Sequence, residues 1–270
     1  MADGSGKRFN QGKVRYDLAP AFAQEQYAKV LTFGSMRYGA HNWEKGMLWS
    51  NVLASLERHL QAIKNGEDYD KESGILHSAH IMCNAAFLTE YYKIYPQGDD
   101  RQHWYKVRPK IALDIDEVLA DFIGSYNEKY DVETTPTQWN FDPKIKERLD
   151  ELKEDKEFWL NIKPLINPNE IPFEPHCYIT SRPCNTEWTE EWLKNNGFSS
   201  RPIYMATDLK DKAELAIEAK IDWFIDDRFE NFLLLERAGI CCFLWNAPHN
   251  QRYDVGFKRI EKFSDLPLFK

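Results

Sequence analysis

Apolar residues follow two different periods in the two halves of the chain. Between residues 20 and 93 they recur every three or four positions, which is typical of amphipathic helices. We expect three helices here: one from Pro20 to a stop at Gly39, a second from Ser50 to about Lys64, and a third from Ser73 or Gly74 to Lys93. Between residues 111 and 245 short apolar runs alternate with helical patterns. This predicts strands near 111–115, 175–180, 202–206, 222–226 and 240–245.

The change of period predicts a multidomain chain with an all-α and an α/β part. We expect an all-α helical domain at residues 1–95, a linker at 96–108, and a three-layer, Rossmann-like α/β domain at 109–270. Residues 119–173 separate the first two strands and predict a small helical cap that closes over substrate. Within this region Phe122, Trp139 and Phe141 either stack on a base or, as the simpler alternative, pack the cap on the sheet.

Composition excludes several classes of protein. The 270 residues carry a net charge of −8, which argues against binding to nucleic-acid polymers, because these need a basic face. The five cysteines show neither a CxxC pair nor zinc-site spacing, so we expect reduced cytoplasmic thiols. We find neither an apolar signal segment nor an apolar run of about 20 residues, so no membrane span is expected. Three short helices make a small core, which predicts a homo-oligomer formed through the N-terminal helices.

Acidic pairs follow two of the predicted strands. Asp114 and Asp116 end the first run, and Asp226 and Asp227 end the fourth. Thr180 and Ser181 follow the second run, and Lys212 begins a helical pattern. Parallel strands bring their carboxyl ends to one edge of the sheet, where ligands bind, and Mg²⁺ prefers oxygen ligands. Each part also has a simpler interpretation: an acidic turn, a turn cap or a solvated lysine.

The order of these parts resembles the haloacid dehalogenase (HAD) superfamily of phosphotransferases over about residues 108–270. The nearest resemblance is to the 5'(3')-deoxyribonucleotidases. It implies that Asp114 is the nucleophile, that Asp116 acts as general acid and then base, and that Lys212 neutralises phosphoryl charge. It also implies that Thr180, with Ser181 beside it, holds phosphate, and that Asp114, Asp116 and Asp226, together with Asp227, hold Mg²⁺. Glu117 departs from the pattern, because the family usually has glycine there, and glycine turns the backbone without strain.

Polar residues of the helical half could form a second site. His77 and His80 share one face of the third helix, while Glu57 and His59 lie on the second. Carboxylates and imidazoles that converge between antiparallel helices could hold a divalent metal. The alternatives are a hydrogen-bonded histidine pair, an exposed Glu57–Arg58 ion pair and a solvated acidic loop at residues 67–72.

Several segments of residues 10–93 resemble the phage dATP/dGTP diphosphohydrolases, a MazG-like group of nucleotide pyrophosphohydrolases. These segments are residues 13–18, 34–39, 42–46, 58–60 and 66–74, followed by His77-x-x-His80-x-x-x-Asn84. The resemblance implies cleavage of dGTP, and of dATP, to the monophosphate and pyrophosphate in the cytoplasm of an infected bacterium. In phages that replace adenine by 2-aminoadenine, the resulting dGMP feeds synthesis of the modified nucleotide.

MazG-like enzymes typically hold Mg²⁺ through Glu-x-x-Glu on one helix and Glu-x-x-Asp on the next. Here His77-x-x-His80 stands at the second position and Glu57 stands alone near the first. We therefore expect a Mg²⁺ or Mn²⁺ site centred on Glu57, His77 and His80, with Glu44, Asp70 and Glu72 in reserve. The predicted substrate contacts are Lys13, Arg15, Arg37 and Asn42, since cations with fixed donors suit phosphate oxygens.

The sequence thus predicts a deoxynucleotide hydrolase with a phosphatase-like second half. If the α/β domain removed phosphate from dGMP, it would consume the product of the helical domain. We therefore expect the α/β domain to act on another nucleotide or only to support assembly. Three alternatives stay open: a 5'-deoxyribonucleotidase, a hydrolase that cleanses the deoxynucleotide pool, and a non-catalytic nucleotide-binding scaffold.

Overall fold

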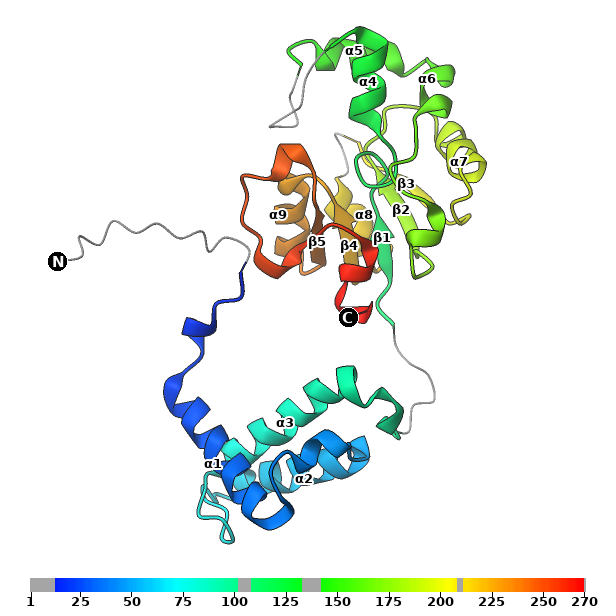
Figure 1. The fold of residues 1–270 in the computed structure, drawn as a ribbon. Helices are drawn as coiled ribbons and strands as arrows, with labels where there is room; N and C mark the ends of the chain where they lie inside the picture. Colours follow the sequence, from blue (N-terminus) through cyan, green and yellow to red (C-terminus); the bar gives the residue numbers. More distant parts are fainter. Residues whose placement is uncertain (1–12, 102–107, 133–141, 208–210, 270) are drawn as a thin grey trace, which may run out of the picture. The chain divides into compact units, whose positions relative to one another are not determined.

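The computed structural model describes residues 13–101, 108–132, 142–207 and 211–269. Contacts divide the chain into a helical unit, Arg15–Lys106, and a second unit built mainly from Val107–Lys270 (Figure 1). The helices of the first unit and the parallel sheet of the second confirm the predicted combination of all-α and α/β parts. Trp139 and Phe141, two of the aromatic residues considered for base stacking, lie outside the described residues.

The helical unit contains the three predicted helices. They are α1 (Ala21–Tyr38), α2 (Trp49–Lys64) and α3 (His77–Ile94), with short 3-10 turns at η1 (Tyr16–Leu18), η2 (Asn42–Lys45) and η3 (Pro96–Gly98). Gly39 ends α1 with a φ of 88°, as the glycine stop predicted. The third helix starts later than predicted, because Ser73 donates its backbone N–H to Asp70 in a separate turn and Gly74 is left-handed at φ 67°.

The core of the helical unit is small and reaches beyond α3. Trp49, Val52 and Tyr91 form one buried cluster, and Val30, Ala79 and Cys83 form another. After η3 the chain returns to the start of α2, where Asp100 accepts hydrogen bonds from Ser50 N at 2.9 Å and Ser50 Oγ at 2.6 Å. The Arg101 guanidinium lies 4.7 Å from the centre of the Trp49 ring. Residues 96–101, expected to be linker, therefore pack on the helical unit.

A parallel six-stranded sheet organises the second unit. Its strands are β1 (Ile111–Leu113), β2 (Cys177–Thr180), β3 (Ile203–Met205), β4 (Trp223–Asp226), β5 (Cys241–Trp245) and β6 (Arg259–Ile260). They lie in the order β3-β2-β1-β4-β5-β6. The first five match the predicted strands, whereas β6 is too short to leave an apolar pattern.

Alternate strand residues face two separate helical layers. Ala112, Ile179 and Phe224 pack with α8 (Lys212–Glu218) and α9 (Phe229–Arg237). Leu113 and Tyr178 face the other way, toward α7 (Thr186–Asn195) and the insert at residues 119–173. The sheet is thus buried on both faces, which is why its strands read as continuous apolar runs.

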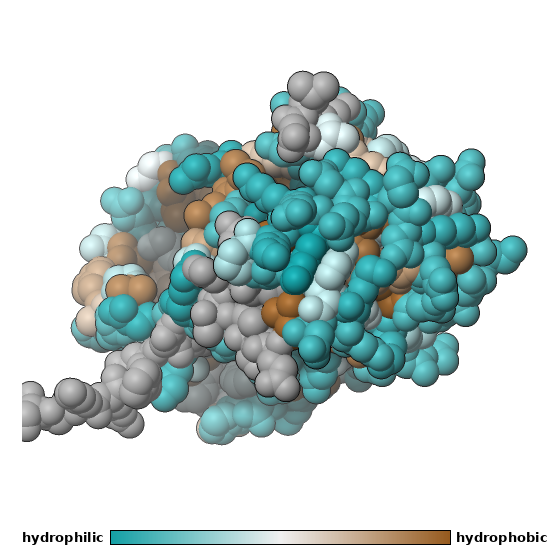
Figure 2. Space-filling model, turned by 90° about the horizontal axis from the view of Figure 1, so that it is seen from above, coloured by the Kyte–Doolittle hydropathy of each residue, from teal (hydrophilic) through white to brown (hydrophobic). Residues whose placement is uncertain are grey.

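The insert is helical, as predicted. It contains α4 (Phe122–Tyr130), α5 (Ile145–Leu152) and α6 (Lys156–Asn161), and Figure 1 shows them together beyond one end of the sheet. Phe122 and Trp159 are buried in the same core as β1 and stack with ring centres 5.8 Å apart. Seen from this end, the surface is mostly hydrophilic, with apolar side chains in small groups (Figure 2).

The strand order creates a switch point between β1 and β4. The chain leaves β1 toward β2 and β3 on one side, and leaves β4 toward β5 and β6 on the other. Leu113 pairs with Ile225 across this junction, so Asp114 and Asp226 reach the same edge of the sheet. Ligands of open α/β sheets bind at such a point. No helix in the described part of the chain is long and apolar enough to cross a membrane.

Candidate functional sites

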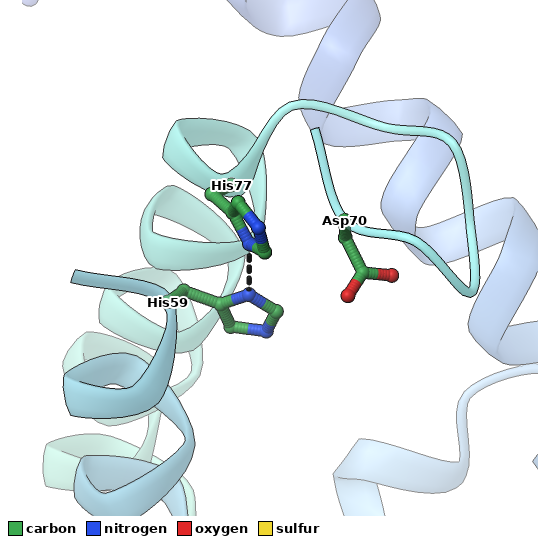
Figure 3. A group of neighbouring side chains, drawn as sticks. All are labelled: His59, Asp70 and His77. Carbon is green, nitrogen blue, oxygen red and sulfur yellow. Dashed lines mark hydrogen bonds between the residues drawn. The ribbon is translucent and has the colours of Figure 1, made fainter. Parts of the chain in front are cut away.

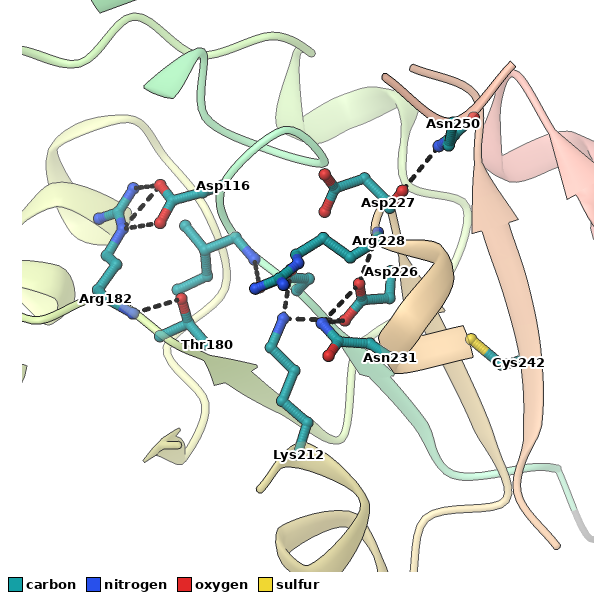
Figure 4. A network of polar contacts seen from close by, with 12 residues as sticks. Asp116, Thr180, Arg182, Lys212, Asp226, Asp227, Arg228, Asn231, Cys242 and Asn250 are labelled. Atoms are coloured by element: carbon teal, nitrogen blue, oxygen red, sulfur yellow. Dashed lines mark hydrogen bonds and ion pairs between the residues drawn. The ribbon is translucent and has the colours of Figure 1, made fainter. Parts of the chain in front are cut away.

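Three buried carboxylates and one lysine meet at the switch point. Oxygens of Asp114, Asp226 and Asp227 lie within 4.8 Å of one another. Lys212, at the start of α8, donates to Asp226 Oδ2 at 2.8 Å and to Asp114 Oδ2 (Figure 4). The first, third and fourth predicted motifs are therefore brought together.

The electrostatics of this cluster favour a cation. Burial raises the pKa of Asp114 well above its ordinary value, and Lys212 opposes this shift. Burial works to lower the pKa of Lys212, but Asp114 and Asp226 outweigh it, so this pKa is raised. Burial likewise raises the pKa of Asp227, although its contact with His249 lowers it. One ammonium group faces three carboxyls, and a divalent ion with oxygen preference, such as Mg²⁺, fits this donor set.

Asp226, which ends β4, and Asp227, which follows it, differ in how many of their carboxylate oxygens already have a hydrogen-bond partner. Asp226 is occupied by Lys212, by Asn231 Nδ2 at 3.0 Å and by the N–H of Arg228 at 2.8 Å. Asp227 Oδ2 lies 2.8 Å from His249 Nε2, while Oδ1 is buried without a hydrogen-bond partner among the described residues. A buried carboxylate oxygen without a partner suits metal ligation. Asp227 thus fits the role of ligand better than Asp226, which was predicted first.

Asp116 lies apart from this acid cluster. Its carboxylate accepts from Arg182 Nε at 3.0 Å and Nη2 at 2.8 Å, and Figure 4 shows the pair on the far side from Asp226 and Asp227. The buried guanidinium of Arg182 lies between the rings of Trp159 and Trp192, at 5.3 Å and 4.9 Å from their centres. Sequence reasoning passed over Arg182, although it directly follows the Thr180-Ser181 pair.

Of the two predicted phosphate contacts, Thr180 is buried in the core and Ser181 lies at the surface. Thr180 ends β2 and is fully buried, and its Oγ1 lies 3.4 Å from the N–H of Arg182. Ser181 is exposed. Thr180 therefore holds the turn that carries Arg182, and Ser181 has the freer hydroxyl of the two.

Glu117 adopts the conformation that the glycine of the related pattern would supply. Its φ is 61°, in the left-handed region that costs a non-glycine residue about 1–2 kcal/mol. The side chain turns inward and Oε1 accepts from Ile123 N, in the first turn of α4, at 2.8 Å. Burial, with help from Asp227, raises the pKa of Glu117 to about 8. Glu117 thus adopts the backbone turn that glycine would adopt, and its side chain brings a fourth carboxyl near Asp227 of the acid cluster.

The helical unit holds a cavity of about 720 Å³ between its helices. Its lining combines polar and charged side chains with apolar and aromatic ones. The polar residues include Arg37, Asn42, Arg58, His59, Asp70, Glu72 and His80, and the apolar residues include Val30, Trp43, Met47, Val52, Cys83 and Phe87. Trp43 stacks on Phe87 with ring centres 5.6 Å apart.

Three histidines and Asp70 gather beside the cavity, and of these His59, Asp70 and His80 line it. His59 Nδ1 lies 2.8 Å from His77 Nδ1 (Figure 3). The rings of His59 and His80 stack with their centres 4.4 Å apart. Ligand atoms of His59, Asp70 and His77 all lie within 4.8 Å of one another. Burial, followed by repulsion from neighbouring imidazoles, lowers the pKa of His59. Burial also lowers the pKa of His80, against the attraction of Asp70. Neutral imidazoles are the form that binds metals.

His59, and not the predicted Glu57, is the residue of α2 that joins this cluster. Val52 is buried and fixes which side of α2 faces inward. At about 100° per residue, His59 lies only about 20° from Val52, whereas Glu57 lies about 140° away. Glu57 is accordingly exposed and takes no part in the cluster.

The other predicted residues fall into two groups. Arg37 and Asn42 line the cavity, and Arg37 also pairs with Glu72. Arg15 is exposed and pairs with Asp17 at 2.7 Å, and neither residue lines the cavity. Glu44 does not line the cavity either, although it pairs at 2.8 Å with His41, which does. Lys13 is exposed and is not part of the lining either.

Comparison with known proteins adds to the account of the helical unit. Residues 3–101 match the family described as dATP/dGTP diphosphohydrolase, N-terminal. A protein of Salmonella phage PMBT28 named dATP/dGTP diphosphohydrolase is 31% identical over 107 residues, which cover 40% of this chain and 36% of the phage protein. The chain therefore spans about a third of the length of that relative. Its helical unit is similar to the N-terminal domain of this family, which confirms the resemblance predicted for residues 10–93.

Proposed function

We propose that the helical unit hydrolyses purine deoxynucleoside triphosphates, dGTP and dATP, to the monophosphate and pyrophosphate. The observation that carries this proposal is a cavity lined by both charged and aromatic side chains, in the segment that matches the diphosphohydrolase family. Its volume of about 720 Å³ lies within the usual range for small-ligand sites. The phage relative bears the name of this activity.

Two kinds of lining residue suit the two ends of a nucleotide. Arg37 and Arg58 bring positive charge to the cavity, which suits phosphates. The stacked Trp43 and Phe87 offer an aromatic surface for a purine base. A divalent cation supplies charge neutralisation and Lewis acidity in such hydrolysis, and His59, Asp70 and His77 are the residues that would hold it.

A panel of deoxynucleoside triphosphates tests this proposal. The full chain is incubated with each substrate and Mg²⁺ or Mn²⁺, and pyrophosphate and phosphate are measured separately. We expect pyrophosphate from dGTP and dATP, with strong loss in Arg58→Gln and little change in the matched Glu57→Gln, whose side chain lies outside the cavity. Absence of pyrophosphate from every substrate would favour the alternative of a nucleotide-binding scaffold. Equal release from all substrates would favour a pool-cleansing hydrolase.

The acid cluster of the α/β unit favours a second activity, hydrolysis of a phosphomonoester such as a deoxynucleoside monophosphate. Asp114 Oδ attacks phosphorus, the P–O ester bond breaks, and the alcohol leaves with a proton from Asp116. Water then attacks the aspartyl phosphate with Asp116 as base, and this releases inorganic phosphate. Lys212 neutralises charge in both steps. The buried Asp114–Lys212–Asp226 arrangement at the switch point supports this HAD-like assignment.

The second activity has its own variant test. Asp114→Asn removes the nucleophile, so release of phosphate from deoxynucleoside monophosphates should stop while pyrophosphate release continues. The exposed Asp150→Asn serves as control. Joint loss of both activities in Asp114→Asn would contradict the assignment of two separate sites.

The proposal includes a role in 2-aminoadenine DNA synthesis, in which dGMP is the useful product. The α/β unit would then spare dGMP and act on another monophosphate.

A further inference from the structure

The donor atoms of the two clusters differ in chemical class. At the switch point the three candidate ligands are all carboxylates, whereas the helical unit gathers two imidazoles and one carboxylate. Mg²⁺ prefers oxygen donors and rarely accepts imidazole. Imidazole ligands suit transition-metal dications. The two clusters therefore differ in the cation they should select.

The histidine pair is already close to the spacing of two ligands on one ion. His59 Nδ1 and His77 Nδ1 are 2.8 Å apart. Two neighbouring ligands at roughly 2.1 Å from an octahedral ion lie about 3.0 Å apart. A small movement would thus place both nitrogens on a shared ion. His77 is 6% exposed, and its Nε2 has no hydrogen-bond partner among the described residues.

Ser73 fixes the other members of the cluster. Its N–H and hydroxyl contact Asp70 Oδ2 at 2.9 Å and 2.8 Å, and the same hydroxyl lies 2.8 Å from His80 Nε2. Asp70 Oδ1 takes part in none of these contacts. Outer contacts of this kind orient metal ligands before the ion arrives. Asp70 is held with one oxygen anchored and the other available.

We infer that the His59–Asp70–His77 cluster binds a transition-metal dication, Mn²⁺ being the example tested, in preference to Mg²⁺, while the aspartate cluster at the switch point takes Mg²⁺ readily. This inference deepens the proposed function of the helical unit, on which the catalytic meaning of the metal rests. His59 and Asp70 line the cavity beside Arg58, so a nucleotide's phosphate oxygens could complete the coordination.

Metal binding to the full chain tests this without any substrate. Protein is stripped with a chelator and titrated with Mn²⁺, and free Mn²⁺ is followed by electron paramagnetic resonance. We expect two bound Mn²⁺ per chain, of which one shows ¹⁴N modulation in electron spin echo spectra. Excess Mg²⁺ should displace the ion without nitrogen coupling and leave the nitrogen-coupled ion in place.

Matched variants assign each ion to its cluster. His59→Gln and His77→Gln should remove the nitrogen coupling and weaken that site at least about tenfold. Asp227→Asn should remove the other ion, and the exposed His176→Gln should change neither. If a histidine variant fails to fold, as judged by circular dichroism, Mg²⁺ competition in the unaltered chain decides whether the nitrogen-coupled site prefers Mn²⁺.

Three outcomes would overturn the inference: no ¹⁴N coupling, displacement of both ions by Mg²⁺ alike, or loss of the coupling in Asp227→Asn, which would assign it to His249 beside that aspartate. The histidines would then be a hydrogen-bonded pair. A nitrogen-coupled ion without any pyrophosphate release would instead contradict the proposed function and leave the metal inference standing.

Discussion

Replacing Glu117 by glutamine should stabilise the α/β unit at alkaline pH and have little effect at acidic pH. The ordinary pKa of this side chain is near 4.5, and burial raises it to about 8 in the folded protein. Between these values the folded state holds the proton more tightly than the unfolded state. Stability therefore falls as the pH rises through this window and stays at its lower level above it.

The size of the effect follows from the interval between the two pKa values. That interval is about 3.5 pH units, and each unit corresponds to ~1.4 kcal/mol, which gives a full penalty of ~5 kcal/mol above pH 8. At pH 5.5 only the first unit applies, so the penalty is ~1.4 kcal/mol. Glutamine stays neutral throughout and can still accept from Ile123 N. The stability gained by Glu117→Gln should thus grow by roughly 3.5 kcal/mol between pH 5.5 and 8.5.

Urea denaturation of the full chain at several pH values measures this gain, in chelator-treated protein so that no cation compensates the carboxylate. Hydrogen exchange of peptides from β2 and β5 reports the opening of the α/β unit by itself. Glu190→Gln, on the exposed side of α7, is the matched control and should follow the original chain. Parallel stability curves for Glu117→Gln and the original chain would refute the reasoning.

Three further predictions concern other contacts. Arg182→Lys keeps the positive charge but loses the pair of hydrogen bonds from Nε and Nη2 to Asp116. Steady-state kinetics of phosphate release should therefore show a larger fall in kcat than change in KM. Trp43→Ala removes a stacking surface worth about 1 kcal/mol, so KM for dGTP should rise roughly fivefold in the pyrophosphate assay; an unchanged KM would exclude Trp43 as base contact. Gly46→Ala would place a methyl group 2.6 Å from the Tyr95 ring and should lower thermal stability more than Gly39→Ala, which is equally left-handed but meets no neighbour; equal losses would contradict this.

Periodicity was sufficient to predict the main elements of both units. The helical stripe around Val52 and Leu56 predicted α2, and the apolar runs before Asp114 and Asp226 predicted two central strands. Their convergence follows from parallel strands, because carboxyl ends meet at one edge. Lys212 arrives there because α8 begins at that edge. The candidate phosphate site was therefore largely predictable from motifs and order.

The remaining site residues depended on tertiary information. The choice of His59 over Glu57 required knowing which side of α2 is buried, and that side is set by the packing of Trp49 and Val52 against Tyr91 of α3. The different contacts of Asp226 and Asp227 depend on Asn231, five residues after Asp226, and on His249, 22 residues after Asp227; neither residue belongs to a motif that the sequence displayed. Arg182 gains its role from two tryptophans on different helices. No local pattern contains such information.

The contact of Asp100 with the start of α2 determines where the chain can be divided for study. A fragment that stopped at residue 95, where the helical pattern fades, would leave the backbone amide of Ser50, in the first turn of α2, without its acceptor and would remove the Arg101 side chain from the Trp49 ring. Such a fragment would misrepresent the stability of the helices around the histidines. The shortest faithful fragment of the first half ends after Arg101.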